Sequence, residues 1–326
     1  MRVLVTGATG FTGGHLARAL AARGYYVRAL VRDPRRAAPL EDAGIEIVRG
    51  DIREDPALRQ ACRDVEVVYH IAAIYRQAGL KTETYRAVNA DGVRRLINAA
   101  AAERVRRVVH CSTVGVHGDV RHPPANEDAP LAPGDIYQQT KLEGERAARA
   151  AAADTDLEVV VARPTGIYGP GDRRLLKLFR GVARRRFVVL GDGGIFYHLT
   201  YIDDLVEGFR LCGEEPAAAG RTYILAGGEV TTLNDLITLI AREAGVDPPR
   251  LHLPVWPFWM AGAACEAVCA PFGLEPPIYR RRVDFFTKSR AFDISRARQE
   301  LGYAPRVGLR EGVRRTLDWY RKAGWI

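Results

Sequence analysis

The strongest constraint on the fold lies in the first residues, "MRVLVTGATGFTGGHLARALAARG". "MRVLVTG" is a short β-branched run that ends in glycine, and "HLARALAARG" has helical periodicity and ends in glycine. Between them, Gly7, Gly10 and Gly13 follow one another at a spacing of three. Glycines at this spacing permit a tight turn, a close backbone approach to a pyrophosphate, and close packing of helix on strand. The pattern predicts a dinucleotide site, with Thr9 and Phe11 of the same loop also in contact with the ligand.

The next segments continue the alternation of strand and helix. "YYVRALVRD", "IEIVRGDI" and "VEVVYHIAAI" are typical of buried parallel strands, and the last two are separated by the helical stretch "EDPALRQACRD". Asp51 and Ile52 follow one strand end, where a carboxylate can accept from an adenine amino group and an aliphatic side chain can cover the ring. Ala72 and Ala73 follow another, where small residues let a cofactor lie close to the backbone. Plain strand-end packing is the alternative for each pair. The repeat predicts a Rossmann-type α/β fold with a doubly wound parallel sheet.

Arg32 bears on the identity of the dinucleotide. An acid that grips the ribose usually follows the glycines by about 20 residues. This chain has Arg32 there, and a guanidinium can clamp a phosphate on the ribose, which favours NADP(H). NAD(H) stays open, because Asp33 could grip the ribose instead.

A proton-transfer pair is indicated by "IYQQTK", residues 136–141. Tyr137 and Lys141 lie one helical turn apart on the same face, and a nearby ammonium lowers the pKa of a phenol from its usual value of about 10. The strand "RRVVHCSTVGVHG" ends in Ser112 and Thr113, at the edge where open α/β sheets bind ligands. We therefore expect Tyr137 to exchange a proton with a substrate oxygen that Thr113 or Ser112 holds.

The chain resembles the extended short-chain dehydrogenases/reductases, the NAD(P)-dependent epimerase/dehydratase family, from end to end. The resemblance rests on "TGATGFTGG", "GDI", "HIAA", "YRAVNADG", "CSTVGVHG", "NEDAP", "YQQTK", "RPTGIYGPGD", "YIDD" and "FDISRARQELGYAP". It implies a nicotinamide cofactor and a catalytic set of Thr113, Tyr137 and Lys141, with Lys141 also bound to the nicotinamide ribose and Asn89 supporting the cofactor crevice. It further implies a homodimer.

The resemblance also implies two domains. Residues 1–170 would form the cofactor-binding domain, rejoined by about 196–229, and residues 171–326 would mainly form a smaller substrate domain. Pro164, Gly166 and Ile167 are expected to border the cofactor. Ser112, His198 and Trp256 are expected to contact the substrate.

Departures from the family's motifs distinguish among its reactions. Dehydratases of the family carry an Asp-Glu pair where this chain has Val114 and Gly115, so dehydration is not expected. Nucleotide-sugar enzymes usually carry an asparagine and an arginine where this chain has Gly166 and Tyr197-His198. "RPTGIYGP" is more similar to the 3β-hydroxysteroid dehydrogenase and dihydroflavonol reductase branch, which implies oxidation or reduction of an apolar alcohol or ketone. A nucleotide-sugar epimerase and a non-catalytic NADP-binding regulator are the alternatives.

Composition narrows the partners and the location. The net charge of +9 is not concentrated in a long basic tract interleaved with aromatic residues, so no nucleic-acid partner is expected. The 5 cysteines form no CxxC motif, which predicts free thiols, a reducing compartment and no metal site. The opening residues already have the pattern of strand and loop, so we expect no signal peptide and a cytoplasmic protein.

The segment "LPVWPFWMAGAACEAVCAPFGLEPP", residues 253–277, is apolar but contains prolines and an acid. It is therefore not expected to span a membrane, which takes about 20 predominantly apolar residues. Three interpretations stay open: a lid over an apolar pocket, a core helix, or a peripheral membrane contact through residues 253–282 with Arg280 to Arg282 as an anchor.

Overall fold

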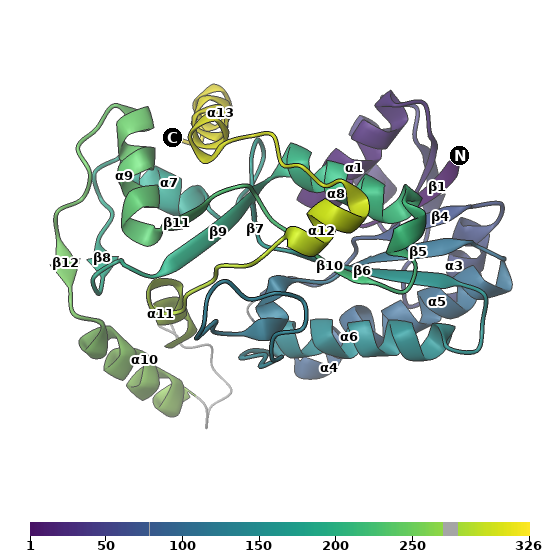
Figure 1. The fold of residues 1–326 in the computed structure, drawn as a ribbon, viewed down its shortest axis with the longest axis horizontal. Helices are drawn as coiled ribbons and strands as arrows, with labels where there is room; N and C mark the ends of the chain where they lie inside the picture. The colour runs from purple at the N-terminus through teal and green to yellow at the C-terminus, as the bar shows by residue number, and fades with distance from the viewer. Residues whose placement is uncertain (78, 270–279) are drawn as a thin grey trace.

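A parallel sheet forms the larger part of the protein in the computed structural model, which describes residues 1–77, 79–269 and 280–326 (Figure 1). The sheet has seven strands in the order β10-β6-β5-β4-β1-β2-β3, and every neighbouring pair is parallel. Its strands are β1 (Arg2–Thr6), β2 (Tyr26–Val31), β3 (Glu46–Arg49), β4 (Val67–His70), β5 (Arg107–Cys111), β6 (Glu158–Pro164) and β10 (Thr222–Leu225).

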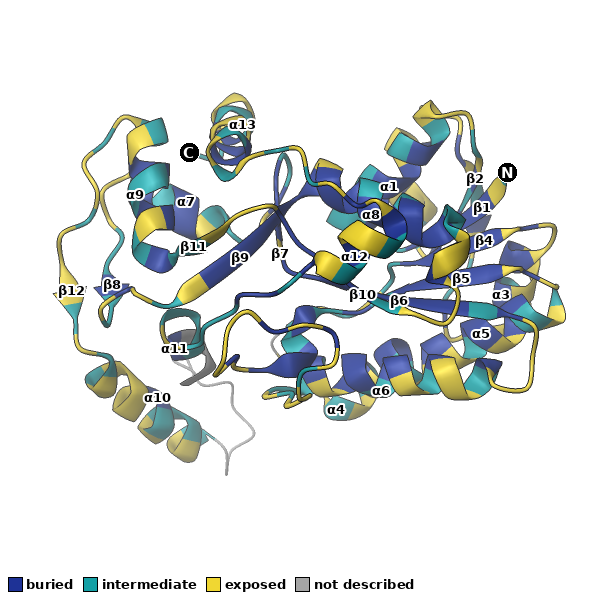
Figure 2. Ribbon diagram, viewed as in Figure 1, coloured by how far each residue is buried: buried dark blue, intermediate teal, exposed yellow. Residues whose placement is uncertain are grey.

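Helices cover both faces of this sheet, which explains why its strands carry few polar residues (Figure 2). One face is covered by α3 (Asp55–Cys62), α5 (Gly92–Ala102) and α6 (Ile136–Ala152), whose Leu58, Leu96 and Ala148 belong to one buried cluster. The other is covered by α1 (Phe11–Ala22) and α8 (Ile202–Glu214), whose Leu16 and Phe209 belong to a second cluster. Short helices connect these elements: η1 (Pro34–Arg36), α2 (Ala38–Glu41), α4 (Thr82–Arg86), η2 (Ala87–Asp91), η3 (Val114–His117) and η4 (Pro216–Ala218).

A smaller part of the molecule is built after β6 and lies to the left in Figure 1. Its three-stranded sheet has the order β11-β9-β7, and a two-stranded sheet pairs β12 with β8. The elements are β7 (Gly166–Tyr168), α7 (Leu176–Ala183), β8 (Val189–Leu190), β9 (Phe196–Tyr201), β11 (Val230–Thr232), α9 (Leu233–Ala244), β12 (His252–Leu253), α10 (Val255–Cys269), α11 (Arg280–Thr287) and α13 (Leu309–Lys322). The chain returns to the large sheet through α8 and β10, and α12 (Ser295–Leu301) packs near β10.

The direction in which strands are added reverses at β1. From there β2 and β3 extend the sheet on one side, and β4, β5, β6 and β10 on the other. Such a reversal opens a ligand crevice at the carboxyl ends of the strands, here just after Thr6 and His70, which pair across β1 and β4. The predicted Rossmann-type α/β fold is confirmed. Among the described residues, no helix has the length and apolar character needed to cross a membrane.

Candidate active site

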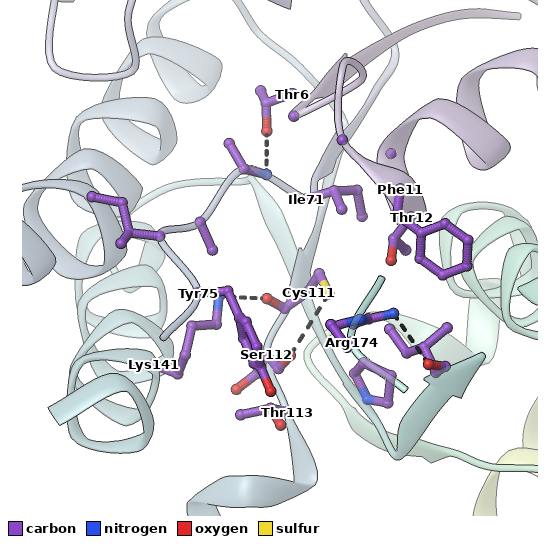
Figure 3. A pocket seen from close by; sticks show the side chains of 18 of the residues that line it. Thr6, Phe11, Thr12, Ile71, Tyr75, Cys111, Ser112, Thr113, Lys141 and Arg174 are labelled. Atoms are coloured by element: carbon purple, nitrogen blue, oxygen red, sulfur yellow. Dashed lines mark hydrogen bonds between the residues drawn. The ribbon is translucent and has the colours of Figure 1, made fainter. Parts of the chain in front are cut away.

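A cavity of about 870 Å³ opens at the carboxyl ends of the central strands. Figure 3 shows its walls: Tyr75, Lys141, Ser112 and Thr113 lie on one side, and Phe11, Thr12 and Arg174 on the other. The sequence predicted that many cofactor residues would meet here. The structure brings to this cavity Gly7, Thr9, Gly10, Phe11, Gly13, Arg32, Asp51, Ile52, Ala72, Ala73, Pro164, Gly166 and Ile167.

The glycine loop forms a cradle that side chains would fill. Gly7 has a φ of +72°, and a Cβ there would stand 2.7 Å from the backbone nitrogen of Ala72. A Cβ on Gly13 would stand 2.4 Å from the carbonyl oxygen of Gly7. No side chain caps the N-terminus of α1, whose first N–H groups therefore remain available to an anion. The loop fits the pyrophosphate of a dinucleotide.

Two ion pairs decide which carboxylates are available to the adenosine part of the predicted cofactor. Asp51 borders the cavity but is held by Arg53 at 2.9 Å, and this hydrogen bond keeps the pKa of Asp51 below its usual value. Asp33, the alternative ribose ligand, caps η1 and pairs with Arg35 at 2.9 Å. Asp33 is not among the residues that border the cavity, whereas Arg32 is.

Tyr137 lies in the first turn of α6, where Asp135 caps the helix by accepting from the N–H of Gln138. Its ring packs edge-on against Tyr75, with centroids 5.0 Å apart, and the guanidinium of Arg76 lies 6.0 Å from its centre. Burial raises the pKa of Tyr137, and Arg174 and Arg76 oppose that rise. The net shift is thus opposite to the one expected from the Tyr-Lys spacing.

The position of Lys141 explains part of the difference between the expected and the observed direction of the pKa shift of Tyr137. Its ammonium donates to the carbonyl oxygen of Cys111 at 2.6 Å, so it is held at the end of β5. The side chain is almost fully buried, and this burial lowers the pKa of Lys141. Lys141 therefore borders the cavity as predicted but acts here as a strand-end donor.

Thr113 and Ser112 play different parts although they are neighbours. Thr113 caps η3, and its hydroxyl oxygen accepts from the N–H of Gly115 at 3.0 Å, which leaves the hydroxyl hydrogen free to donate. Ser112 donates its hydroxyl to Glu145 inside the protein. Both residues border the cavity, but only the Thr113 hydroxyl has a hydrogen to offer to a ligand there.

A buried ion pair supports this wall. Glu145, one turn after Lys141 on α6, receives Arg163 through two hydrogen bonds of 3.0 and 2.7 Å. Arg163 also donates to the carbonyl oxygen of Glu127 and contacts Nε2 of His117. Sequence reasoning missed this pair. The charged residue in "RPTGIYGP" at the end of a buried strand was the available signal.

Asn89 holds the segment that follows β4. Its side-chain oxygen accepts from the N–H of Ile74, and its amide donates to the carbonyl of Ile74 and to Thr140. The segment carrying Ala72, Tyr75 and Arg76 is thereby tied to α6. Asn89 itself does not border the cavity; its effect on the crevice passes through Ile74.

The structure places two of the residues expected to contact the substrate away from the cavity. His198 is buried, with one ring nitrogen bonded to the carbonyl of Gly227 at 2.8 Å and the other accepting from the N–H of Phe292. Trp256 lies on α10 and is 69% exposed. Neither borders the cavity, because β9 directs His198 into the packing between segments and α10 carries Trp256 outward.

Several residues of the cavity were not predicted as ligand contacts. They include Tyr75 and Arg76 after β4, Gln138 on α6, and Arg290 after α11. Arg174 also borders the cavity, and its guanidinium lies 5.1 Å from the ring centre of Phe11. Tyr75 and Arg76 follow "HIAAI" directly, so their position after a central strand was the signal.

Residues 3–226 match the NAD dependent epimerase/dehydratase family. The chain belongs to this family. It is 31% identical over 327 residues to the 2-alkyl-3-oxoalkanoate reductase of Stenotrophomonas maltophilia, covering 97% of this chain and 98% of that protein. It is 28% identical over 347 residues to a 3beta-hydroxysteroid-dehydrogenase/decarboxylase, isoform 2, of Arabidopsis thaliana, covering 97% of this chain but 61% of that longer protein.

Solved structures agree with the family. The UDP-glucuronic acid 4-epimerase from Bacillus cereus, determined in complex with NAD, matches with a TM-score of 0.79 at 25% identity over 99% of both chains. The predicted resemblance is thus confirmed, and this family member is an NAD(P)-dependent enzyme.

Most described residues of the segment after residue 253 are exposed or half-buried. Gly262 is the one buried residue of α10, and Trp256, Trp259, Met260 and Val268 are exposed. Residues 270–279 and the side chains of Arg280 to Arg282 lie outside the described part of this segment. The core-helix interpretation does not fit α10, while a peripheral membrane contact, a homodimer and a cytoplasmic location stay predictions.

Proposed function

We propose that this protein is an oxidoreductase that interconverts a secondary alcohol and a ketone on an apolar substrate, with NADP(H) as its preferred cofactor. The observation that carries the proposal is the meeting of Tyr137 and Thr113 in the same cavity as the glycine loop. When bound, the cofactor supplies or accepts a hydride. The chain's own residues then have to hold the substrate oxygen and move one proton.

Tyr137 is suited to give that proton. Because burial raises its pKa, the phenol stays protonated at neutral pH and donates to the oxygen of a carbonyl that is being reduced. In the reverse direction the phenolate form of Tyr137 takes the proton of the alcohol. Thr113 orients the substrate oxygen with its free hydroxyl hydrogen, and Lys141, held on the Cys111 carbonyl, keeps a positive charge at the end of β5.

The apolar substrate is supported by the relatives. The names of two of them specify a 3-oxoalkanoate and a 3beta-hydroxysteroid, each a hydrocarbon body that bears a ketone or a hydroxyl. Tyr75 and Val114 border the cavity and would offer apolar surface to such a body. A sterol, terpenoid or flavonoid-like substrate fits this description.

The preference for NADP(H) rests on three arginines. Arg18, Arg32 and Arg36 border the cavity together with the glycine loop, and Arg36 donates to the carbonyl oxygen of Thr9 at 3.4 Å. A phosphate on the ribose would meet this positive charge, since Asp33 is turned to Arg35. We expect Arg32→Ala to weaken NADPH binding by about 10- to 100-fold, the worth of one or two charge-assisted hydrogen bonds, with little change for NADH. Equal affinity of the unmutated protein for the two cofactors would remove this part of the proposal.

Nucleotide-sugar epimerisation is the second candidate, because a solved 4-epimerase shares the fold along its whole length. The two reactions differ in their demand for cofactor. An oxidoreductase consumes one nicotinamide per product, which changes the absorbance of the solution, whereas an epimerase returns the hydride and shows no net change. We expect stoichiometric consumption with ketones or alcohols of the sterol and flavonoid type. Product formation from a nucleotide sugar without net absorbance change would instead establish the epimerase.

A further inference from the structure

The charges that border the cavity are strongly unbalanced. Among the described residues, its carboxylates are Asp51 and Asp172, and both are already paired, the first with Arg53 and the second with Arg174 at 2.8 Å. Its cations in the same part of the chain are Lys141 and seven arginines: Arg18, Arg32, Arg36, Arg76, Arg173, Arg174 and Arg290. The cavity therefore favours an anionic ligand, and more than one anionic group can be accommodated.

These cations fall into separate groups. Arg18, Arg32 and Arg36 surround the glycine-loop end, where the cofactor phosphates would bind. Lys141 and Arg174 are held by the protein, and Arg173 lies over the ring of Trp325, 5.0 Å from its centre. Arg76 and Arg290 are the two remaining cations among the described residues that border the cavity.

Arg76 lies beside the proposed proton donor. Its guanidinium stands 5.8 Å from the ring centre of Tyr75 and 6.0 Å from that of Tyr137. One terminal nitrogen pairs with Asp135 at 2.7 Å, but its buried Nε has no hydrogen-bond partner among the described residues. Asp135 also caps α6, so its negative charge is shared between Arg76 and the helix N-terminus. Arg76 is therefore only partly neutralised.

Arg290 is fixed in place by its backbone. Its N–H donates to the carbonyl of Phe196 at 2.9 Å, and the neighbouring Ser289 bonds to Asp119 and to the N–H of Val120. The side chain is partly buried at the cavity wall, and its guanidinium makes no hydrogen bond or ion pair with the residues that the structure describes. Arg290 and Arg76 border the same cavity, and both oppose the rise that burial causes in the pKa of Tyr197.

We infer that Arg290, with Arg76 beside it, binds a carboxylate of the substrate, so that the natural substrate is a hydroxy acid or oxo acid with an apolar body. The inference rests on the proposed function, because it assigns one more group of the same substrate. A guanidinium binds a carboxylate through two parallel hydrogen bonds, and the N–H groups of the Arg290 guanidinium have no partner among the described residues.

The amount of unneutralised charge favours a carboxylate over a diphosphate. Arg290 contributes one free positive charge, and Arg76 contributes a fraction because Asp135 holds it. A single negative charge balances this pair, whereas a diphosphate would leave an excess negative charge beside Tyr137. The geometry also ties specificity to the reaction, because Arg76 packs on the ring that exchanges the proton.

The test compares acids with their methyl esters, which differ in charge but not in the reacting carbon. Purified protein with NADP+ is assayed on 3-hydroxydecanoate and a 2-alkyl-3-hydroxy acid, and on the methyl ester of each, with Arg290→Gln, Arg290→Lys and the unmutated protein. Arg186→Gln serves as the control, because Arg186 is exposed and does not border the cavity. We expect the unmutated protein to prefer the acid in kcat/KM by about 10- to 100-fold, the worth of a charge-assisted pair.

Arg290→Gln should abolish this preference by raising KM for the acid, with similar turnover of the ester, and Arg290→Lys should restore part of it. Equal kcat/KM for acid and ester in the unmutated protein, or an equal loss on both in Arg290→Gln, would overturn the inference. If neither is turned over, the proposed function fails on these substrates, and calorimetry on the protein saturated with NADPH decides the inference separately. Tighter binding of the acid that is lost in Arg290→Gln supports it, and equal binding of acid and ester refutes it.

Discussion

The buried ion pair behind the active-site wall makes Arg163→Met a sharp test of how the site is held. The side chains of Arg163 and Glu145 are 6% and 5% exposed. Methionine fills part of the space but removes the guanidinium that neutralises Glu145, together with its contacts to Glu127 and His117. Glu145 then stays buried with Ser112 as its remaining described donor.

Breaking a buried pair from one side costs about 3–5 kcal/mol, because an uncompensated charge is left in the interior. This is a large share of a total stability of about 5–15 kcal/mol. Adding Glu145→Gln removes the stranded charge but keeps an acceptor for Ser112, so the double variant should regain at least about 2 kcal/mol of the loss. The control is Arg314→Met on α13, where the pair with Glu311 is exposed and should be worth less than about 1 kcal/mol.

Urea unfolding followed by circular dichroism measures these differences. The reasoning is refuted if Arg163→Met costs no more than Arg314→Met, or if the double variant is no more stable than Arg163→Met alone. NADPH binding by Arg163→Met is measured without urea, at a temperature where the variant is folded. This binding should weaken less than substrate turnover, because the pair supports Ser112 and α6 rather than the glycine loop.

Two further predictions concern the cradle and the buried histidines. Gly13→Ala should leave the fold intact but weaken NADPH binding at least about tenfold, because a Cβ 2.4 Å from the Gly7 carbonyl forces the loop apart; unchanged affinity by fluorescence titration would contradict this. Burial lowers the pKa of His70 to about 3 and that of His110 well below its usual value. Below pH ~6.5 the unfolded chain therefore binds protons that the folded protein does not. The free energy of unfolding then falls by up to about 1.4 kcal/mol per pH unit for each histidine. The melting temperature of His110→Phe should therefore fall less between pH 7 and pH 5 than that of the unmutated protein. Equal falls in melting temperature would show that His110 is not the group responsible.

The parts of the site that could be predicted are those set by local sequence and strand-end position. Gly7 and Gly13 are recognisable because the turn and the close packing permit no side chain, and Thr113 and Tyr137 because a strand end and a helix face fix where they point. The sheet order then brings these separate segments to one cavity.

The parts that could not be predicted depend on contacts between distant segments. His198 was expected at the substrate, but its ring nitrogens bond to the backbone of Gly227 and Phe292, 29 and 94 residues away. The sequence predicts a strand at Arg163 and a helix at Glu145, but it does not predict that the two side chains pair. Nothing in the sequence around Arg290 indicates that its guanidinium borders the cavity without a partner among the described residues, whereas Arg280 to Arg282 are visible as a cluster.

The lowered pKa expected for Tyr137 shows the same limit. Spacing on a helix brings Lys141 near, but the direction of its ammonium is set by the carbonyl at the end of β5. Burial then dominates the pKa of Tyr137, and burial is a property of the folded molecule.

The central claim is that Tyr137 exchanges the proton in a reaction that consumes cofactor. Tyr137→Phe removes one oxygen and keeps the ring against Tyr75. The decisive measurement is turnover of NADPH with a ketone substrate at saturating cofactor, beside the dissociation constant of NADPH for the same variant. The account predicts a loss of about 10²- to 10⁴-fold in kcat, the usual contribution of a general acid, with NADPH affinity changed less than about threefold. Undiminished kcat in Tyr137→Phe would contradict it.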